Sequence, residues 1–122
     1  MHITRESNLP KEIHNPHGEN VQEILGRVAG GVEGHSLARV TILPGKSSLP
    51  HFHKESEESY LILSGKALME IDEKKFELSP GEAVLIEPQE VHQISNPGPG
   101  DLIFLAVCVP AWYPEDSFDV AA

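Results

Sequence analysis

The sequence predicts an all-β protein, a single domain in which short strands form a sandwich or a small barrel. Apolar and alternating stretches of strand length recur at intervals of roughly eight to ten residues. Ten prolines and ten glycines separate them, which indicates many turns and little helix. A chain of 122 residues can bury one core but not two, so we expect one domain.

Residues 1–20 are polar and are expected to form an N-terminal arm or loop with at most a short strand. Pro10, Pro16 and Gly18 interrupt this segment. It contains three histidines without ligand-like spacing, which we interpret as solvated loop residues: His2, His14 and His17.

Residues 21–109 are expected to form the body of the domain. Residues 21–28 predict an opening strand, and a glycine-rich stretch at 30–34 predicts the turn of a hairpin. Residues 35–43 alternate between the two faces of a strand and contain β-branched side chains, so they predict the next strand. Pro44 and Gly45 end it.

Residues 60–63 predict a strand in which Tyr60 and Ile62 share one face and two leucines share the other. A tight turn at Gly65 predicts a hairpin into a strand at 67–71. Three further strands, each bounded by turn residues, are expected at 76–78, 83–86 and 91–94.

Residues 102–109 are apolar without a break, which is typical of a strand in the middle of a sheet that is covered on both faces. Cys108 lies in this run, and a small buried thiol is favoured over a reactive one. Residues 110–122 are expected to be a C-terminal tail lying across the body or a neighbouring subunit, because aromatic residues stand among its acids and prolines: Trp112, Tyr113 and Phe118.

The formal charge of −10 argues against binding to nucleic acid or to an anionic membrane, since phosphate contacts need clustered basic residues. No stretch has the roughly 18 apolar residues of a membrane span, and the N-terminus has no apolar signal core. A single cysteine excludes an intrachain disulfide and fits a reducing compartment. We therefore expect a cytoplasmic protein.

The motif with the clearest chemistry is a pair of histidines two residues apart, followed by an acidic run that opens a strand. On an extended chain His51 and His53 project from the same face. Glu57 or Glu58 then supplies a carboxylate, and Glu58 is favoured because it shares a face with Tyr60. Imidazole and carboxylate groups together are typical ligands of divalent metals.

The spacing around this pair resembles the first signature of the cupin family. It reads Gly45, five residues, His51-x-His53, four residues, Glu58, six residues and Gly65. A second family signature is similar to residues 81–96, where His92 and Asn96 follow Gly81 in register. The chain departs from the second pattern at two turn positions, with Glu87 in place of the usual proline and Gln89 in place of the usual glycine.

The resemblance covers roughly residues 37 to 109 and implies a double-stranded β-helix, the cupin-type jelly-roll barrel. It also implies one divalent transition metal (Fe, Mn, Ni, Co or Zn), and the sequence does not choose among these ions. The residues that it implies as ligands are His51, His53, Glu58 and His92. Catalytic residues are not assigned, and cupins of this kind commonly form homodimers through sheet edges.

The resemblance leaves several functions open. One is a metal-dependent enzyme that acts on a small organic substrate inside the barrel, of the dioxygenase, isomerase or decarboxylase type. Another is a non-enzymatic module that binds or senses a metal or a small ligand, and a third is a metal-free structural dimer. Tyr60 and Ile62 are candidate pocket residues, and Glu90 and Tyr60 are candidate bases. Arg39 is a candidate anchor for an anion, although a solvated residue on the strand face is the favoured interpretation.

Overall fold

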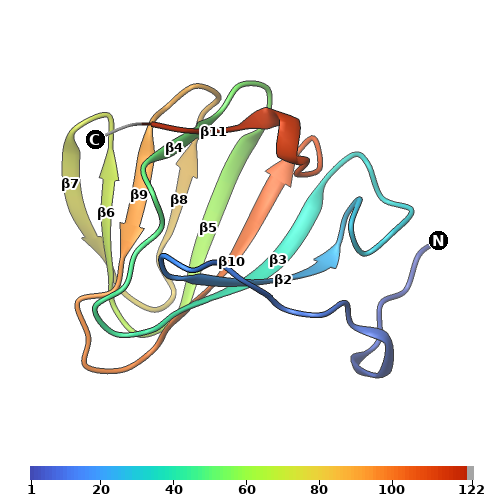
Figure 1. The fold of residues 1–122 in the computed structure, drawn as a ribbon, viewed down its shortest axis with the longest axis horizontal. Helices are drawn as coiled ribbons and strands as arrows, with labels where there is room; N and C mark the ends of the chain where they lie inside the picture. Colours follow the sequence, from blue (N-terminus) through green and yellow to red (C-terminus); the bar gives the residue numbers. More distant parts are fainter. Residues whose placement is uncertain (121–122) are drawn as a thin grey trace.

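The computed structural model describes residues 1–120, and in this range the chain forms two antiparallel β-sheets, one of six strands and one of five. The all-β prediction is confirmed, and the paired sheets have the architecture of a double-stranded β-helix (Figure 1). Helical structure in the described range consists of two 3₁₀ turns, η1 (Glu6–Asn8) and η2 (Pro114–Asp116). No helix in residues 1–120 has the length and apolar character needed to span a membrane.

The larger sheet places the strands in the order β1, β2, β3, β10, β5 and β8. Their bounds are β1 (Ile13–His14), β2 (Glu19–Leu25), β3 (Ser36–Ile42), β10 (Leu102–Val109), β5 (Glu57–Ser64) and β8 (Ala83–Ile86). The smaller sheet has the order β11 (Ser117–Asp119), β4 (His51–His53), β9 (His92–Ser95), β6 (Ala67–Ile71) and β7 (Lys74–Leu78).

The core lies between the sheets and follows the period of two that the sequence shows. In β5 the Tyr60 and Ile62 side chains are buried, whereas Leu61 and Leu63 are 39 % and 46 % exposed. Alternate residues of the neighbouring strand β10, such as Phe104, and of the facing sheet, such as Met69 and Ile94, complete the same cluster. The predicted strand faces are therefore confirmed.

The turn at Gly65 does not form the predicted hairpin. Strand β5 pairs with β10 and β8, whereas β6 pairs with β7 and β9 in the other sheet, so the chain crosses between sheets at this point. Gly65 has φ +84°, and a Cβ atom on it would lie 2.4 Å from the Asp101 carbonyl oxygen. The close approach of the Asp101 backbone explains why glycine stands here.

Strand β10 lies between β3 and β5, so its predicted place in the middle of a sheet is confirmed. Only its inner face is fully buried. Ile103, Leu105 and Val107 are half-buried on the outer face, so the strand is not covered on both sides within one chain. An unbroken apolar run does not distinguish a strand that is covered on one face from a strand that is covered on both faces.

Candidate metal centre

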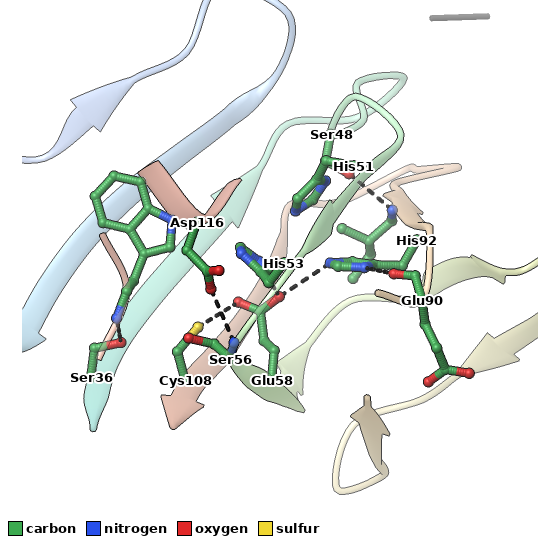
Figure 2. Close-up of polar contacts among 12 residues, drawn as sticks. Ser36, Ser48, His51, His53, Ser56, Glu58, Glu90, His92, Cys108 and Asp116 are labelled. Carbon is green, nitrogen blue, oxygen red and sulfur yellow. Dashed lines mark hydrogen bonds and ion pairs between the residues drawn. The ribbon is translucent and has the colours of Figure 1, made fainter. Parts of the chain in front are cut away.

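Four side chains from three strands converge at one end of the space between the sheets. His51 and His53 lie on β4, Glu58 on β5 and His92 on β9, and one ligand atom from each lies within 4.8 Å of the others. Figure 2 shows the three imidazole rings and the carboxylate directed toward a common point. The structure thus brings together the four residues that the sequence singled out.

Strand register explains the convergence. His51 pairs directly with His92 across β4 and β9, which brings their ring centroids to 4.2 Å. His53 follows on the same face of β4, while the Phe52 ring points the other way and stacks on Phe118 of β11 at 5.2 Å. The alternation of an extended strand is therefore what aims both β4 histidines inward.

Backbone carbonyls fix the orientation of two of the rings. Nδ1 of His51 donates to the Leu49 carbonyl at 2.8 Å, and Nδ1 of His92 donates to the Glu90 carbonyl at 3.0 Å. A carbonyl oxygen only accepts, so in both rings Nδ1 carries the hydrogen and Nε2 is left to face the cluster. A metal-binding imidazole needs this arrangement.

His53 is the clearest sign that the cluster is built to hold a cation. Both of its ring nitrogens are buried and have no hydrogen-bond partner among residues 1–120. Nε2 of His53 lies 3.3 Å from Oε1 of Glu58, but not in a direction that makes a hydrogen bond. Buried polar atoms without partners are costly, and a bound cation would remove this cost at the ring nitrogen that it contacts.

Glu58 is ionised despite its burial. Burial alone would raise its pKa, but the close contacts with the His53 and His92 rings lower the pKa well below the usual value. The His53 pKa is lowered by burial and raised more strongly by Glu58, so the net shift is upward. Burial and His92 lower the pKa of His51 to about 4, which keeps this ring neutral and able to act as a ligand at neutral pH.

The neighbouring acid Glu57 is exposed, so the strand-face argument selected the carboxylate that lies in the cluster. Oε1 of Glu58 lies 3.2 Å from Nε2 of His92, and Oε2 accepts a hydrogen bond from the Cys108 thiol at 3.2 Å. Burial, followed by the Glu58 charge, raises the Cys108 pKa far above its ordinary value. Cys108 is therefore a protonated, buried thiol, as predicted.

The C-terminal segment positions the loop between the β4 ligands and Glu58. Asp116 is buried, and its carboxylate accepts hydrogen bonds from the backbone amides of Glu55 at 2.7 Å and Ser56 at 3.0 Å. The Ser56 hydroxyl donates to the Pro110 carbonyl at 2.9 Å. Sequence reasoning missed Asp116, because the contact spans some sixty positions and no local pattern marks it.

A cavity of about 290 Å³ leads from the cluster to the surface. His51, His53 and Glu58 line it, together with apolar side chains of β3 and β10 and with residues of the N-terminal segment and β2. Tyr60 lines it as well, and its ring centroid lies 6.1 Å from that of His92 in an edge-to-face arrangement. Burial, followed by the Glu58 charge, raises the Tyr60 pKa well above its usual value, so the phenol stays protonated.

The other residues that the sequence suggested for the pocket, the anion anchor and the base lie away from the cluster and the cavity. Ile62 is fully buried in the core rather than on the cavity, and Arg39 is exposed, where it donates to Gln22. The favoured interpretation of Arg39 as a solvated residue is therefore confirmed, and its alternative role as an anchor in the cavity is wrong. The Glu90 side chain turns away from the cluster (Figure 2). Its Oε1 accepts a hydrogen bond from the Glu87 backbone amide.

Several residues of the first 20 positions line the cavity although sequence reasoning gave them no role, among them His17 and Glu19. His17 and Glu19 are 2.9 Å apart, from Nε2 to Oε1, and both contribute to the cavity lining. The interpretation of His17 as a solvated loop residue is therefore incomplete. Only the pairing of the arm with β2, which the sequence does not show, reveals this position.

The donor set fits a divalent first-row metal. Three imidazoles and one carboxylate suit iron, manganese, nickel, cobalt or zinc, and they do not decide among these ions. A six-coordinate ion held by this set keeps two positions for other molecules, whereas a four-coordinate zinc ion would be saturated.

Comparisons with known proteins agree with this geometry. The family model of the cupin domain matches residues 38–108. The chain is 33 % identical to protein MJ1618 of Methanocaldococcus jannaschii over 95 % of this chain and 84 % of that protein. It is 30 % identical to the oxalate-binding protein of Thermotoga maritima over 88 % of this chain and 93 % of that protein.

Solved structures share the fold at lower identity. Pac13 of Streptomyces, described as a nucleoside dehydratase, superposes with a TM-score of 0.77 and 16 % identity over 98 % of this chain and 91 % of that one. This likeness supports the fold alone. Taken with the two signatures and the family model, it leads to one conclusion: the chain belongs to the cupin family.

Proposed function

We propose that this cupin is a metal-dependent enzyme that acts on a small organic acid bound in the cavity. The observation that carries the proposal is the buried His53 ring, which has no hydrogen-bond partner in the described chain and faces three further ligand atoms. His51, His53, Glu58 and His92 would hold the ion. When bound, such an ion supplies Lewis acidity toward a substrate oxygen or, if it is redox-active, oxygen chemistry.

The cavity supports a small substrate with two adjacent oxygens. Two neighbouring positions of a six-coordinate ion fit a chelating pair, such as the carboxylate and carbonyl of a 2-oxo acid. The apolar side chains of Val40, Phe104 and Ala106 then suit a short carbon chain. The oxalate-binding relative from Thermotoga maritima supports this ligand class for the present chain.

Within this class, the residues favour chemistry that begins with loss of a proton or a carboxyl group beside a carbonyl, as in an isomerase or a decarboxylase. The protonated Tyr60 phenol lies on the cavity and can donate a hydrogen bond to a ligand oxygen. Dioxygenase activity is the competing enzymatic proposal, and oxygen consumption by the metal-loaded protein would identify it.

The second candidate function is a binding module without turnover. The relative from Thermotoga maritima favours it, because that protein is described by what it binds and not by a reaction. Under this alternative the same four residues and cavity would hold a chelated ligand. A protein that binds the ligand tightly and leaves it unchanged would support this candidate over the enzyme.

Both candidate functions require a bound metal ion, and metal content measured by mass spectrometry tests this requirement. Protein purified without chelator or histidine tag is expected to carry about one metal per chain, and the His51→Ala/His92→Ala variant is expected to carry none. A change of the exposed His35 to alanine is the matched control and should retain the metal. Metal-free wild-type protein that also fails to take up iron, manganese, nickel, cobalt or zinc would reject the site.

The assembly and the location of the protein stay predictions. We propose a homodimer in the cytoplasm that binds neither nucleic acid nor membranes. The exposed Leu61, Leu63 and Leu85 side chains on the outer face of the larger sheet support self-association. A monomer in light scattering at micromolar concentration would contradict the dimer.

A further inference from the structure

A second polar pair lies on the same cavity as the metal-ligand cluster. Nε2 of His17 donates to Oε1 of Glu19 at 2.9 Å, and the Asn15 side-chain amide donates to the same oxygen at 3.4 Å. All three residues line the cavity. The Glu19 side chain is 19 % exposed and that of His17 is 33 % exposed, so the carboxylate lies deeper than the imidazole.

The backbone holds this pair in place. The Gly18 amide donates to the Asn15 carbonyl at 3.1 Å, and the Asn15 amide donates to the Glu19 carbonyl at 2.9 Å, which closes a tight turn. A Cβ atom on Gly18 would lie 2.4 Å from the Ser47 carbonyl oxygen, so the turn packs directly on the segment that leads into β4. The pair is therefore built into the body of the domain rather than carried on a free arm.

Strand geometry directs Glu19 toward the cavity. Glu19 and Val21 are alternate residues of β2, and both line the cavity. Oε1 of Glu19 accepts both hydrogen bonds, and Oε2 takes part in none of the hydrogen bonds found in residues 1–120. This leaves Oε2 free to contact a ligand.

Several charged groups act on Glu19. Burial raises its pKa, the His17 contact partly offsets this increase, and the charges of Glu58 and Asp119 add to it. Lys11 is a further charged residue on the cavity lining. A carboxyl group with a raised pKa is better suited to take and return a proton near neutral pH than an ordinary surface carboxylate.

We infer that Glu19 is the proton-exchanging residue of the cavity and that His17 is its positioning partner. The inference rests on the proposed function, because it requires a ligand held at the metal-ligand cluster of the same cavity. Oε2 of Glu19 would take a proton from the carbon beside the ligand carbonyl, and the electron pair of that C–H bond would move toward the carbonyl oxygen. Return of the proton to carbon completes the exchange, and the half-exposed His17 connects Glu19 with solvent protons.

Calorimetry with oxalate tests the inference without any turnover. Oxalate is a dianion, so its binding beside Glu19 favours the protonated carboxyl group and should draw a proton from the buffer. Titrations of metal-loaded protein at pH 6 in two buffers of different ionisation enthalpy measure this uptake. We expect uptake of a measurable fraction of a proton in wild type that is absent in Glu19→Gln, with oxalate still bound.

Deuterium exchange tests the same residue with a ligand that carries an exchangeable proton. Metal-loaded wild type is expected to introduce deuterium beside the carbonyl of 2-oxobutanoate in D₂O, as followed by proton NMR. Glu19→Gln should slow this exchange at least about 100-fold, the usual size of a general-base contribution. His17→Gln, which keeps a donor group, should slow it less than His17→Ala. Glu12→Gln on the exposed part of the same arm is the matched control.

The outcomes separate this inference from the proposed function. Wild-type protein that holds no metal would reject the proposed function and the inference together. Metal-loaded protein in which Glu19→Gln retains both proton uptake and exchange, or in which wild type shows neither, would overturn the inference and leave the metal site standing. Metal content and thermal unfolding of Glu19→Gln, both expected to match wild type, show that the variant is folded.

Discussion

The Sγ atom of Cys108 lies 3.2 Å from Oε2 of Glu58, on the opposite side of the carboxylate from His92 (Figure 2). The thiol donates to one carboxylate oxygen while the histidines face the other. Cys108 thereby fixes the rotation of the Glu58 carboxylate. A cysteine that sequence reasoning treated as a core residue is thus also a positioning group for a candidate ligand.

Replacing Cys108 with alanine should weaken metal binding, because Oε2 of Glu58 would lose its donor and the carboxylate would be free to rotate. We expect the dissociation constant to rise about 10-fold, at the lower end of effects seen for groups that orient ligands. Cys108→Ser keeps a donor and is the matched variant, with an expected change well below that of alanine. A competition titration against a chromophoric chelator measures both, and equal constants for wild type and Cys108→Ala would refute this role.

Replacing Asp116 with alanine should destabilise the protein, because the backbone amides of Glu55 and Ser56 would lose their acceptor. We expect the free energy of unfolding to fall by about 3 kcal/mol, since hydrogen bonds to a charged acceptor are among the stronger ones. Metal affinity should fall as well, since these amides order the loop between His53 and Glu58. Urea unfolding measures the first effect, and the exposed Glu115→Ala is the control expected to show neither.

Metal-free protein should lose stability as the pH falls from 6.5 toward 4. The folded-state pKa of His51 is about 4 and its ordinary value is 6.5, so the unfolded chain binds a proton in this window and the folded chain does not. The contribution is at most about 3 kcal/mol. Urea unfolding of chelator-treated protein should show a smaller pH slope for His51→Ala than for wild type or for His35→Ala. Parallel slopes for all three would contradict the His51 shift.

Replacing Gln89 with glycine should stabilise the protein. Gln89 has φ +71°, in the left-handed region that residues with a Cβ atom adopt at a cost, and family resemblance places glycine here. We expect a gain of about 1 kcal/mol, or a rise in melting temperature of roughly 4 °C. Gln89→Ala, which keeps the Cβ atom, should show no such gain by differential scanning calorimetry. A lower melting temperature for the glycine variant would show that the backbone of Gln89 is not strained.

Much of the fold was predictable because the alternation of apolar and polar residues marks a strand within a short stretch of sequence. Period-two alternation identified the inward faces of β5 and β9, and the same alternation brought His51 and His53 to one side of β4. The crossing at Gly65 was not predictable, because a turn within a sheet and a turn between sheets use the same residues. What differs is the distant Asp101 backbone that packs on this glycine.

In the candidate site, too, some residues could be identified from the local sequence and others only from tertiary contacts. Its four ligand residues lie on strands whose spacing carries the family signature, so the sequence could nominate them. The Asp116 contact with the 54–56 loop and the His17–Glu19 pair depend on tertiary pairing of the chain's two end segments with the central sheets. No periodicity or spacing in one sequence reports such pairing, so these residues became visible only in three dimensions.

Strand β4 is bordered by β9 through one residue pair and by β11 through three. The strand that carries His51 and His53 is therefore secured mainly by β11 (Ser117–Asp119), which lies far from it in the sequence. Before β11 pairs with β4 during folding, the two histidines lie on a strand that only the His51–His92 pair borders. Under the proposed function, stable metal binding then requires that β11 has already closed the smaller sheet.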